Sequence, residues 1–162
     1  MPNKVHSKEI VFRFIKNQDI DFDKLKLKKV VFYDSRNPLQ CSCALIAHTN
    51  EKELKRIAQT NDSVNSYFVG FSETEAENFQ KKGFRIDPSF HEYHGHVDVI
   101  YDTTNLVEDD KPLPNIIKQT WASIQRNSIF LIDNNPSSEE FNYYKLRIDP
   151  NQEGNKKLIR VT

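Results

Sequence analysis

Short stretches in which apolar and polar residues alternate recur along this chain, a pattern typical of β-strands with one face in a core. In the first stretch, residues 9–15, the side chains of Phe12 and Phe14 share one face, while Arg13 lies on the other. Further strand-like stretches cover residues 24–33, 41–47, 66–71, 84–86, 94–102, 129–132, 143–148 and 156–161. The last two are joined by a polar loop and predict a C-terminal hairpin.

Helix starts are predicted by residue pairs typical of N-terminal caps, in which Asn or Ser is followed three positions later by Glu. Such pairs begin at Asn50, Ser72 and Ser137. The first two predict helices over residues 50–58 and 72–82. Another helix is predicted over residues 114–126, where apolar residues recur at helical spacing and Trp121 is expected to lie in the core.

These elements predict an α+β fold in a single domain over residues 1–162. We expect a mixed or mainly antiparallel sheet of six or seven strands, with three or four helices largely on one face and the C-terminal hairpin. A doubly wound parallel sheet is disfavoured, because the spacings between strands are short and glycine-rich turns are missing.

Composition excludes several classes of protein. The 162 residues contain 23 Lys and Arg and 23 Asp and Glu, so no net charge attracts nucleic acid or anionic lipid. Residues 1–7 lack the apolar core of a signal peptide, and the longest apolar run, residues 43–47, is too short to cross a bilayer. We therefore expect a cytoplasmic protein with no membrane association. Its two cysteines, Cys41 and Cys43, suit small buried hydrophobes better than a redox pair or metal clip.

The richest stretch for chemistry is residues 91–102, which holds three of the five histidines. On an extended strand His94, His96 and Asp98 share one face, and His and carboxylate side chains are ligands for a divalent transition metal such as zinc or iron. The Cα atoms of His94 and Asp98 would lie about 13 Å apart at a rise of about 3.3 Å per residue, so a metal site needs a bend at Gly95 or other ligands. Two alternatives remain: acid–base chemistry by His96 with Asp98, and an exposed polar face.

Arg13 is the second candidate. Its neighbours on the same strand face are apolar, and a guanidinium with little water around it requires an anionic partner. That partner is either an internal Asp or Glu or the phosphate or carboxylate of a ligand.

A row of lysines is the third. Lys24, Lys26, Lys28 and Lys29 alternate with apolar residues or adjoin them. On one strand face they suit contact with a nucleic-acid backbone, or the charged rim of an edge strand. Neighbouring aspartates dilute their field, so nucleic-acid binding is disfavoured.

Four segments follow one another in an order that resembles short bacterial proteins of no assigned function. They are Phe12-Arg13-Phe14, Ser42-Cys43-Ala44-Leu45, Tyr67-Phe68-Val69-Gly70-Phe71, and Asp87-Pro88 leading to His96-Val97-Asp98-Val99-Ile100. The resemblance covers a little over half of the chain and implies no activity. Two enzyme families match less well. In two-histidine phosphoesterases the pair would be His48 and His96, but the Ser or Thr two positions on is missing from both; in ADP-ribosyl-transfer folds only Arg13 fits.

No phosphate-binding glycine loop and no CxxC, HExxH or GxSxG motif occurs. The leading hypothesis is therefore a small cytoplasmic binding or protein-interaction module, an accessory subunit of a bacterial operon, with a protein partner. The competing hypothesis is a small metal-dependent, NAD-handling or phosphoester-handling enzyme that uses His96, Asp98 and Arg13. A third is RNA binding by the lysine row. The first two differ in one geometric requirement, since the enzyme needs Arg13 and His96 in one pocket.

Overall fold

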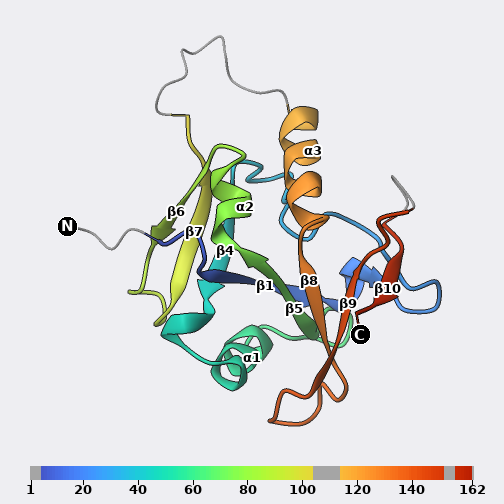
Figure 1. Cartoon of the computed structure of the whole chain (residues 1–162). Coiled ribbons are helices and arrows are strands. Elements are labelled where there is room, and N and C mark those ends of the chain that lie inside the picture. The colour runs from blue at the N-terminus through green and yellow to red at the C-terminus, as the bar shows by residue number, and fades with distance from the viewer. Residues whose placement is uncertain (1–4, 104–113, 152–155, 162) are drawn as a thin grey trace.

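The computed structural model describes residues 5–103, 114–151 and 156–161. Its centre is an eight-stranded sheet with the order β10-β9-β8-β5-β1-β4-β7-β6, in which each neighbouring pair is antiparallel (Figure 1). The strands are β1 (Ile10–Lys16), β4 (Gln40–Leu45), β5 (Phe68–Glu75), β6 (Phe84–Pro88), β7 (His96–Tyr101), β8 (Ile129–Asp133), β9 (Tyr143–Ile148) and β10 (Leu158–Arg160). A separate short pair is formed by β2 (Ile20–Asp21) and β3 (Lys26–Leu27).

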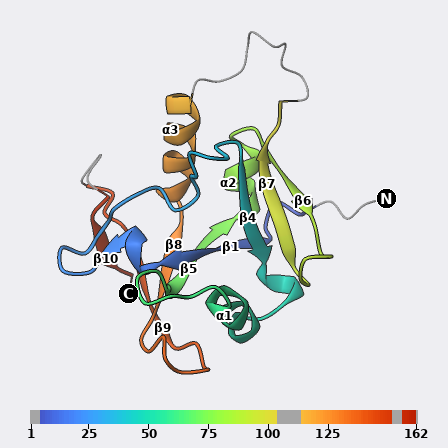
Figure 2. The ribbon, with the colours of Figure 1, turned by 180° about the vertical axis from the view of Figure 1, so that it is seen from behind.

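Helices cover both faces of the sheet. The α-helices are α1 (Glu51–Gln59), α2 (Ala76–Gln80) and α3 (Pro114–Gln125), and short 3-10 turns cover Asn17–Asp19 and Ile46–His48. Phe79 of α2 and Trp121 of α3 belong to one apolar core, and Leu54 of α1 belongs to another. In both views of the ribbon α2 and α3 lie above β1 and β5, and α1 lies below them (Figures 1 and 2).

The predicted fold class is wrong, because it placed the helices largely on one face of the sheet. We expected an α+β domain with three or four helices largely on one face. The structure is dominated by the large antiparallel sheet, and its described part holds three α-helices divided between the two faces. A sheet buried on both faces has two cores, which is why strand residues such as Phe12 and Val11 are both buried although they point in opposite directions.

The cap-like pair at Ser72 accounts for one error. Residues 72–75 continue β5 and pair with β1, and Ser72 and Glu73 also pair with β8. A central strand satisfies its backbone groups on two sides, so these long-range pairings override the local helix signal and leave α2 only five residues long. The pair at Ser137 also starts no helix in the structure.

Other local predictions are confirmed. The side chain of Asn50 accepts a hydrogen bond from the backbone N–H of Glu53 at 2.8 Å, as an N-cap of α1 should. Trp121 is fully buried in α3, and its indole N–H donates to the carbonyl oxygen of Pro38. β9 and β10 form the C-terminal hairpin.

The lysine row does not form the expected strand face. Only the two residues of β3 are in a strand, and Leu25 has a φ of 51°, in the left-handed region, which breaks the alternation of faces. The same segment lies along the outer edge of β10. The N–H of Leu158 donates to Leu25, and the N–H of Leu27 donates to Lys156. The hairpin edge is therefore partly covered from within the chain.

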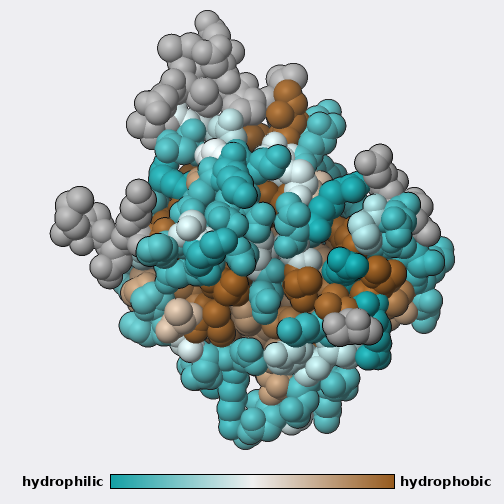
Figure 3. Space-filling view, in the orientation of Figure 1, coloured by the Kyte–Doolittle hydropathy of each residue, from teal (hydrophilic) through white to brown (hydrophobic). Residues whose placement is uncertain are grey.

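Apolar residues also reach the surface. Figure 3 shows brown areas across the middle of one side of the molecule, between larger hydrophilic areas above and below. Among the described residues, the large hydrophobic side chains that are exposed are those of Phe22, Val64, Tyr67, Ile116 and Tyr143. Within the part of the chain that the structure describes, none of the helices is both long and apolar enough to cross a membrane.

Candidate anion-binding site

Arg13 and His96 lie on opposite faces of the sheet. Phe12 is paired with Ala44, and Ala44 with His96, so these three residues form one row across β1, β4 and β7. Side chains alternate along a strand, so Arg13 points to the other face. The structure therefore does not bring Arg13 into one pocket with His96.

His96 and Asp98 are joined through a serine. The Ser89 Oγ lies 2.6 Å from His96 Nδ1 and donates to Asp98 Oδ2 at 3.1 Å. On the other side of the ring, His96 Nε2 is 3.4 Å from Glu92 Oε2 and 3.9 Å from Asp98 Oδ1. The imidazole is 2% exposed and packs against the ring of Tyr93. Nothing in the sequence pattern had singled out Ser89.

This order of groups differs from that of a catalytic relay. In a serine–histidine–carboxylate relay the imidazole lies between hydroxyl and carboxylate, and takes the proton of the hydroxyl. Here the hydroxyl lies between Nδ1 of the imidazole and Asp98 Oδ2, and it donates its hydrogen bond to Asp98. The backbone N–H of Ser89 also donates to the carbonyl of His96 at 2.9 Å. The network thus holds together the two ends of the loop that connects β6 to β7.

His94 turns away from this network. Its ring lies 5.3 Å from that of Phe90 and 6.1 Å from that of His48, measured between ring centroids. Gly95 makes the turn, with a φ of 97° in the region that favours glycine. Across residues 5–103, 114–151 and 156–161, no group of three or more His, Cys, Asp and Glu side chains is placed to hold a metal ion.

Arg13 lies between backbone carbonyls. Its Nε donates to the oxygen of Val31 at 3.2 Å, and its Nη1 donates to the oxygen of Ser42 at 2.9 Å. No carboxylate of the described residues is within ion-pair distance of it. The pKa of Arg13 is raised, chiefly by the negative charge that the neighbouring Cys41 carries when ionised.

Arg13 lines a cavity of about 540 Å³. The cavity is formed by β1, by the 3-10 turn at Asn17–Asp19, by the segment that follows β3 and by α3, and its aromatic lining residues are Phe14 and Tyr33. Its charged lining residues are Arg13, Lys16, Lys29, Arg36, Lys118, Asp19 and Asp34. Cations therefore outnumber carboxylates, and the volume falls in the range of about 300–1,000 Å³ that is usual for small-molecule sites.

Some of these charges already have partners. Lys29 Nζ is 3.2 Å from Asp19, and Arg36 Nη2 is 3.2 Å from Asp34. Hydrogen bonds from Arg36 hold the pKa of Asp34 below its usual value. Both carboxylates of the cavity are thus engaged by its own cations.

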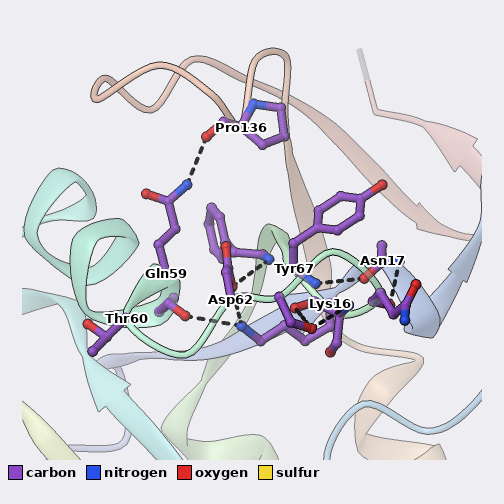
Figure 4. Close-up of polar contacts among 12 residues, drawn as sticks. Lys16, Asn17, Gln59, Thr60, Asp62, Tyr67 and Pro136 are labelled. Atoms are coloured by element: carbon purple, nitrogen blue, oxygen red, sulfur yellow. Dashed lines mark hydrogen bonds and ion pairs between the residues drawn. The ribbon is translucent and has the colours of Figure 1, made fainter.

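Lys16 directs its ammonium group out of the cavity. Its Nζ lies 2.8 Å from Asp62 Oδ1 and donates to the oxygen of Ala58 at 3.0 Å, so it ties β1 to the end of α1 (Figure 4). Lys118 remains, with its Nζ 5.5 Å above the centre of the Tyr33 ring. Arg13 and Lys118 are therefore the two cations of this cavity that have no carboxylate partner among the described residues.

Sequence reasoning identified Arg13 but not its surroundings. An arginine among apolar neighbours on a strand can be recognised in the sequence, whereas Lys118 lies at an exposed helix position like many lysines.

Comparisons with known proteins identified no relative, since no family model, no curated protein and no solved structure matches this chain.

Proposed function

We propose that this protein is a small binding module whose cavity at Arg13 holds a ligand with a phosphate or carboxylate group. The observation that carries the proposal is that Arg13 has hydrogen-bond partners but no negatively charged partner among the described residues. Arg13 lines a cavity rich in cations, and its guanidinium donates hydrogen bonds to two carbonyl oxygens and has no carboxylate partner among the described residues. An anion in the cavity would supply that partner.

The hydrogen-bonding capacity of Arg13 supports this choice of ligand. A guanidinium carries five N–H donors in a planar fork, which matches the two oxygens of a carboxylate or phosphate. Two of its nitrogens already donate to Val31 and Ser42, which fixes the orientation of the group. A preoriented cation loses less entropy on binding than a flexible one.

Lys118 and Tyr33 define the remainder of the ligand. The ammonium group suits a second negative charge, and the tyrosine hydroxyl is a donor and acceptor for a polar group. A small molecule with two or more negative charges, such as pyrophosphate or a dicarboxylate, matches the two cations that have no carboxylate partner and is small enough to enter the cavity. We also propose a cytoplasmic location and a protein partner; the location is supported by the two cysteines, which are both free, as is usual in a reducing compartment.

Titration calorimetry with pyrophosphate and with malonate tests the function. Wild type is expected to bind at least one of the two, and Arg13→Gln is expected to lose that binding. Arg85→Gln is the matched control, because Arg85 is an exposed arginine on β6 that pairs with Asp87. Circular dichroism would show that both variants are folded. Equal binding by Arg13→Gln and wild type, or no binding of either anion by wild type, would refute the proposal.

A further inference from the structure

One face of the sheet is left open over its last strands. Helix α1 packs on the face to which Phe12 points and buries the part of that face around Phe71. Tyr143, Lys145 and Arg147 point to the same face from β9, and all three are exposed. In Figure 3 hydrophobic areas cross the middle of the molecule, where Figure 1 shows β5, β8 and β9. The described helices therefore leave this region of the sheet uncovered.

Strand register places an apolar residue between two opposite charges on this face. Glu73 of β5 is paired with Ile129 of β8, and Arg147 of β9 is paired with Ile159 of β10. Ile129 also lies next to Arg147, because the antiparallel pairing of β8 with β9 that begins at Phe130 continues one position further. Ile129 and Ile159 are half-buried, so part of each remains accessible. Ile129 thus has a carboxylate on one side and a guanidinium on the other.

The charges of this face balance one another without forming pairs. The face carries two carboxylates, Glu51 and Glu73, and two cations, Lys145 and Arg147. Burial raises the pKa of Glu51, the nearby negative charge of Glu73 acts in the same direction, and the positive charge of Lys145 opposes both. None of the four side chains has an ion-pair partner among the described residues. Such a face has no net charge to attract nucleic acid or a strongly charged protein, and it offers both signs to a partner.

We propose that this face is the interface of a symmetric homodimer, in which Glu73 of each copy pairs with Arg147 of the other. In a two-fold dimer both copies use the same surface patch, so the patch must complement itself. A two-fold axis that runs along β8 above Ile129 exchanges the two flanks of this residue. The carboxylate of one copy then lies over the guanidinium of the other, and the dimer makes this contact twice.

Apolar burial and the charge of the whole chain favour a second copy as the occupant. Two sheets that pack face to face lie about 10 Å apart, and side chains from both sheets fill the space between them. Ile129, Ile159 and Tyr143 supply the apolar surface for this contact. The formal net charge of the chain is zero, so two copies do not repel each other at long range.

Sedimentation equilibrium of the full chain, from micromolar to submillimolar concentration, tests the inference. Wild type is expected to associate to the mass of two chains. Arg147→Glu and Glu73→Arg should each raise the dissociation constant about a hundredfold or more, because two like-charge contacts replace two ion pairs. Glu73→Arg/Arg147→Glu restores opposite charges and should recover the dimer. Arg126→Glu is the matched control, since Arg126 is an exposed arginine just after α3, which packs on the other side of the sheet.

Circular dichroism shows whether each variant is folded, and Arg147→Glu carries the test if Glu73→Arg, on a central strand, does not fold. Three results would overturn the inference: a monomeric wild type, a dimer that Arg147→Glu leaves unchanged, or a folded double variant that stays monomeric. Arg13 points to the other face of the sheet, so anion binding is expected to persist in Arg147→Glu. Failure of the dimer and failure of the anion site are therefore measured separately.

Discussion

Lys55 and Asp133 form an ion pair in the interior, with 2.6 Å between Nζ and Oδ2 and only 1% of each side chain exposed. Lys55 also donates to the backbone oxygens of Asn135 and Glu140. The pair thus joins α1 to the end of β8 and to the segment that follows it. It lies outside the candidate site and serves the fold.

Lys55→Met should therefore destabilise the protein strongly. Removing one partner of a buried pair leaves an uncompensated charge, which costs about 3–5 kcal/mol in the free energy of unfolding. Urea denaturation measures the change, and Lys55→Met/Asp133→Leu should recover part of it. Lys52→Met is the control on the same helix. Its ion pair with Glu140 is exposed, so its loss should cost no more than about 1 kcal/mol. Similar losses in the two single variants would contradict this account.

Lys118→Glu tests the second cation of the cavity. Its charge reversal should weaken anion binding about tenfold, equivalent to about 1.4 kcal/mol, because the residue is exposed and its field is screened by water. Titration calorimetry measures the effect, and Lys82→Glu provides an exposed lysine outside the cavity. An equal loss in both variants would mean that only net charge matters.

Ser89→Ala should lower stability rather than remove a chemical activity. The variant leaves His96 Nδ1 and one oxygen of Asp98 without their partner, which costs about 1–3 kcal/mol for a buried group. Thermal and urea unfolding measure the loss, with Ser35→Ala as an exposed control. Unchanged stability would contradict a closing role for Ser89 between β6 and β7.

Tyr93 should make the protein sensitive to alkali. Burial raises the pKa of its phenol, and the phenol O–H donates to the carbonyl oxygen of Cys43 at 3.4 Å. The folded state therefore favours the neutral phenol, so its contribution is complete below the unfolded pKa of about 10 and is lost as the pH rises above it. Urea denaturation from about pH 8 upward measures the unfolding free energies of wild type and of Tyr93→Phe. As the pH rises, wild type should lose stability relative to the variant, which has no phenol to ionise. A difference that stays constant with pH would contradict a role of Tyr93 ionisation.

Predictions from local sequence signals were correct where the structure depends only on residues that are close together in the chain. The cap at Asn50 needs only the N–H of Glu53 three residues away, and the same turn contains both. The cap-like pair at Ser72 failed because β5 pairs with β1 and β8, which come from distant parts of the chain. A single sequence contains no direct record of such pairings. These pairings decide which residues become helical and which face of the sheet each helix covers, so that part of the fold was not predicted.

The candidate site shows the same difference between features set by neighbouring residues and features set by distant ones. Arg13 was readable because an arginine between apolar neighbours needs a partner whatever the fold. The other cation of its cavity, Lys118, comes from a helix more than half the chain away, and the alternation that seemed to align the lysines of residues 24–29 ends at the left-handed Leu25. His94 and His96 share a face only on a straight strand, and the turn at Gly95 separates them.

The segment along β10 also bears on how copies of the chain meet one another. An open strand edge is a template on which a second molecule can extend the sheet, and repeated extension leads to fibres. At one end of this sheet Leu25 and Leu27 already occupy backbone groups of residues 156–158. At the other end β6 presents Pro88, which has no N–H to donate, beside the charged pair of Arg85 and Asp87. Both ends of the sheet are thus poor starting points for polymerisation.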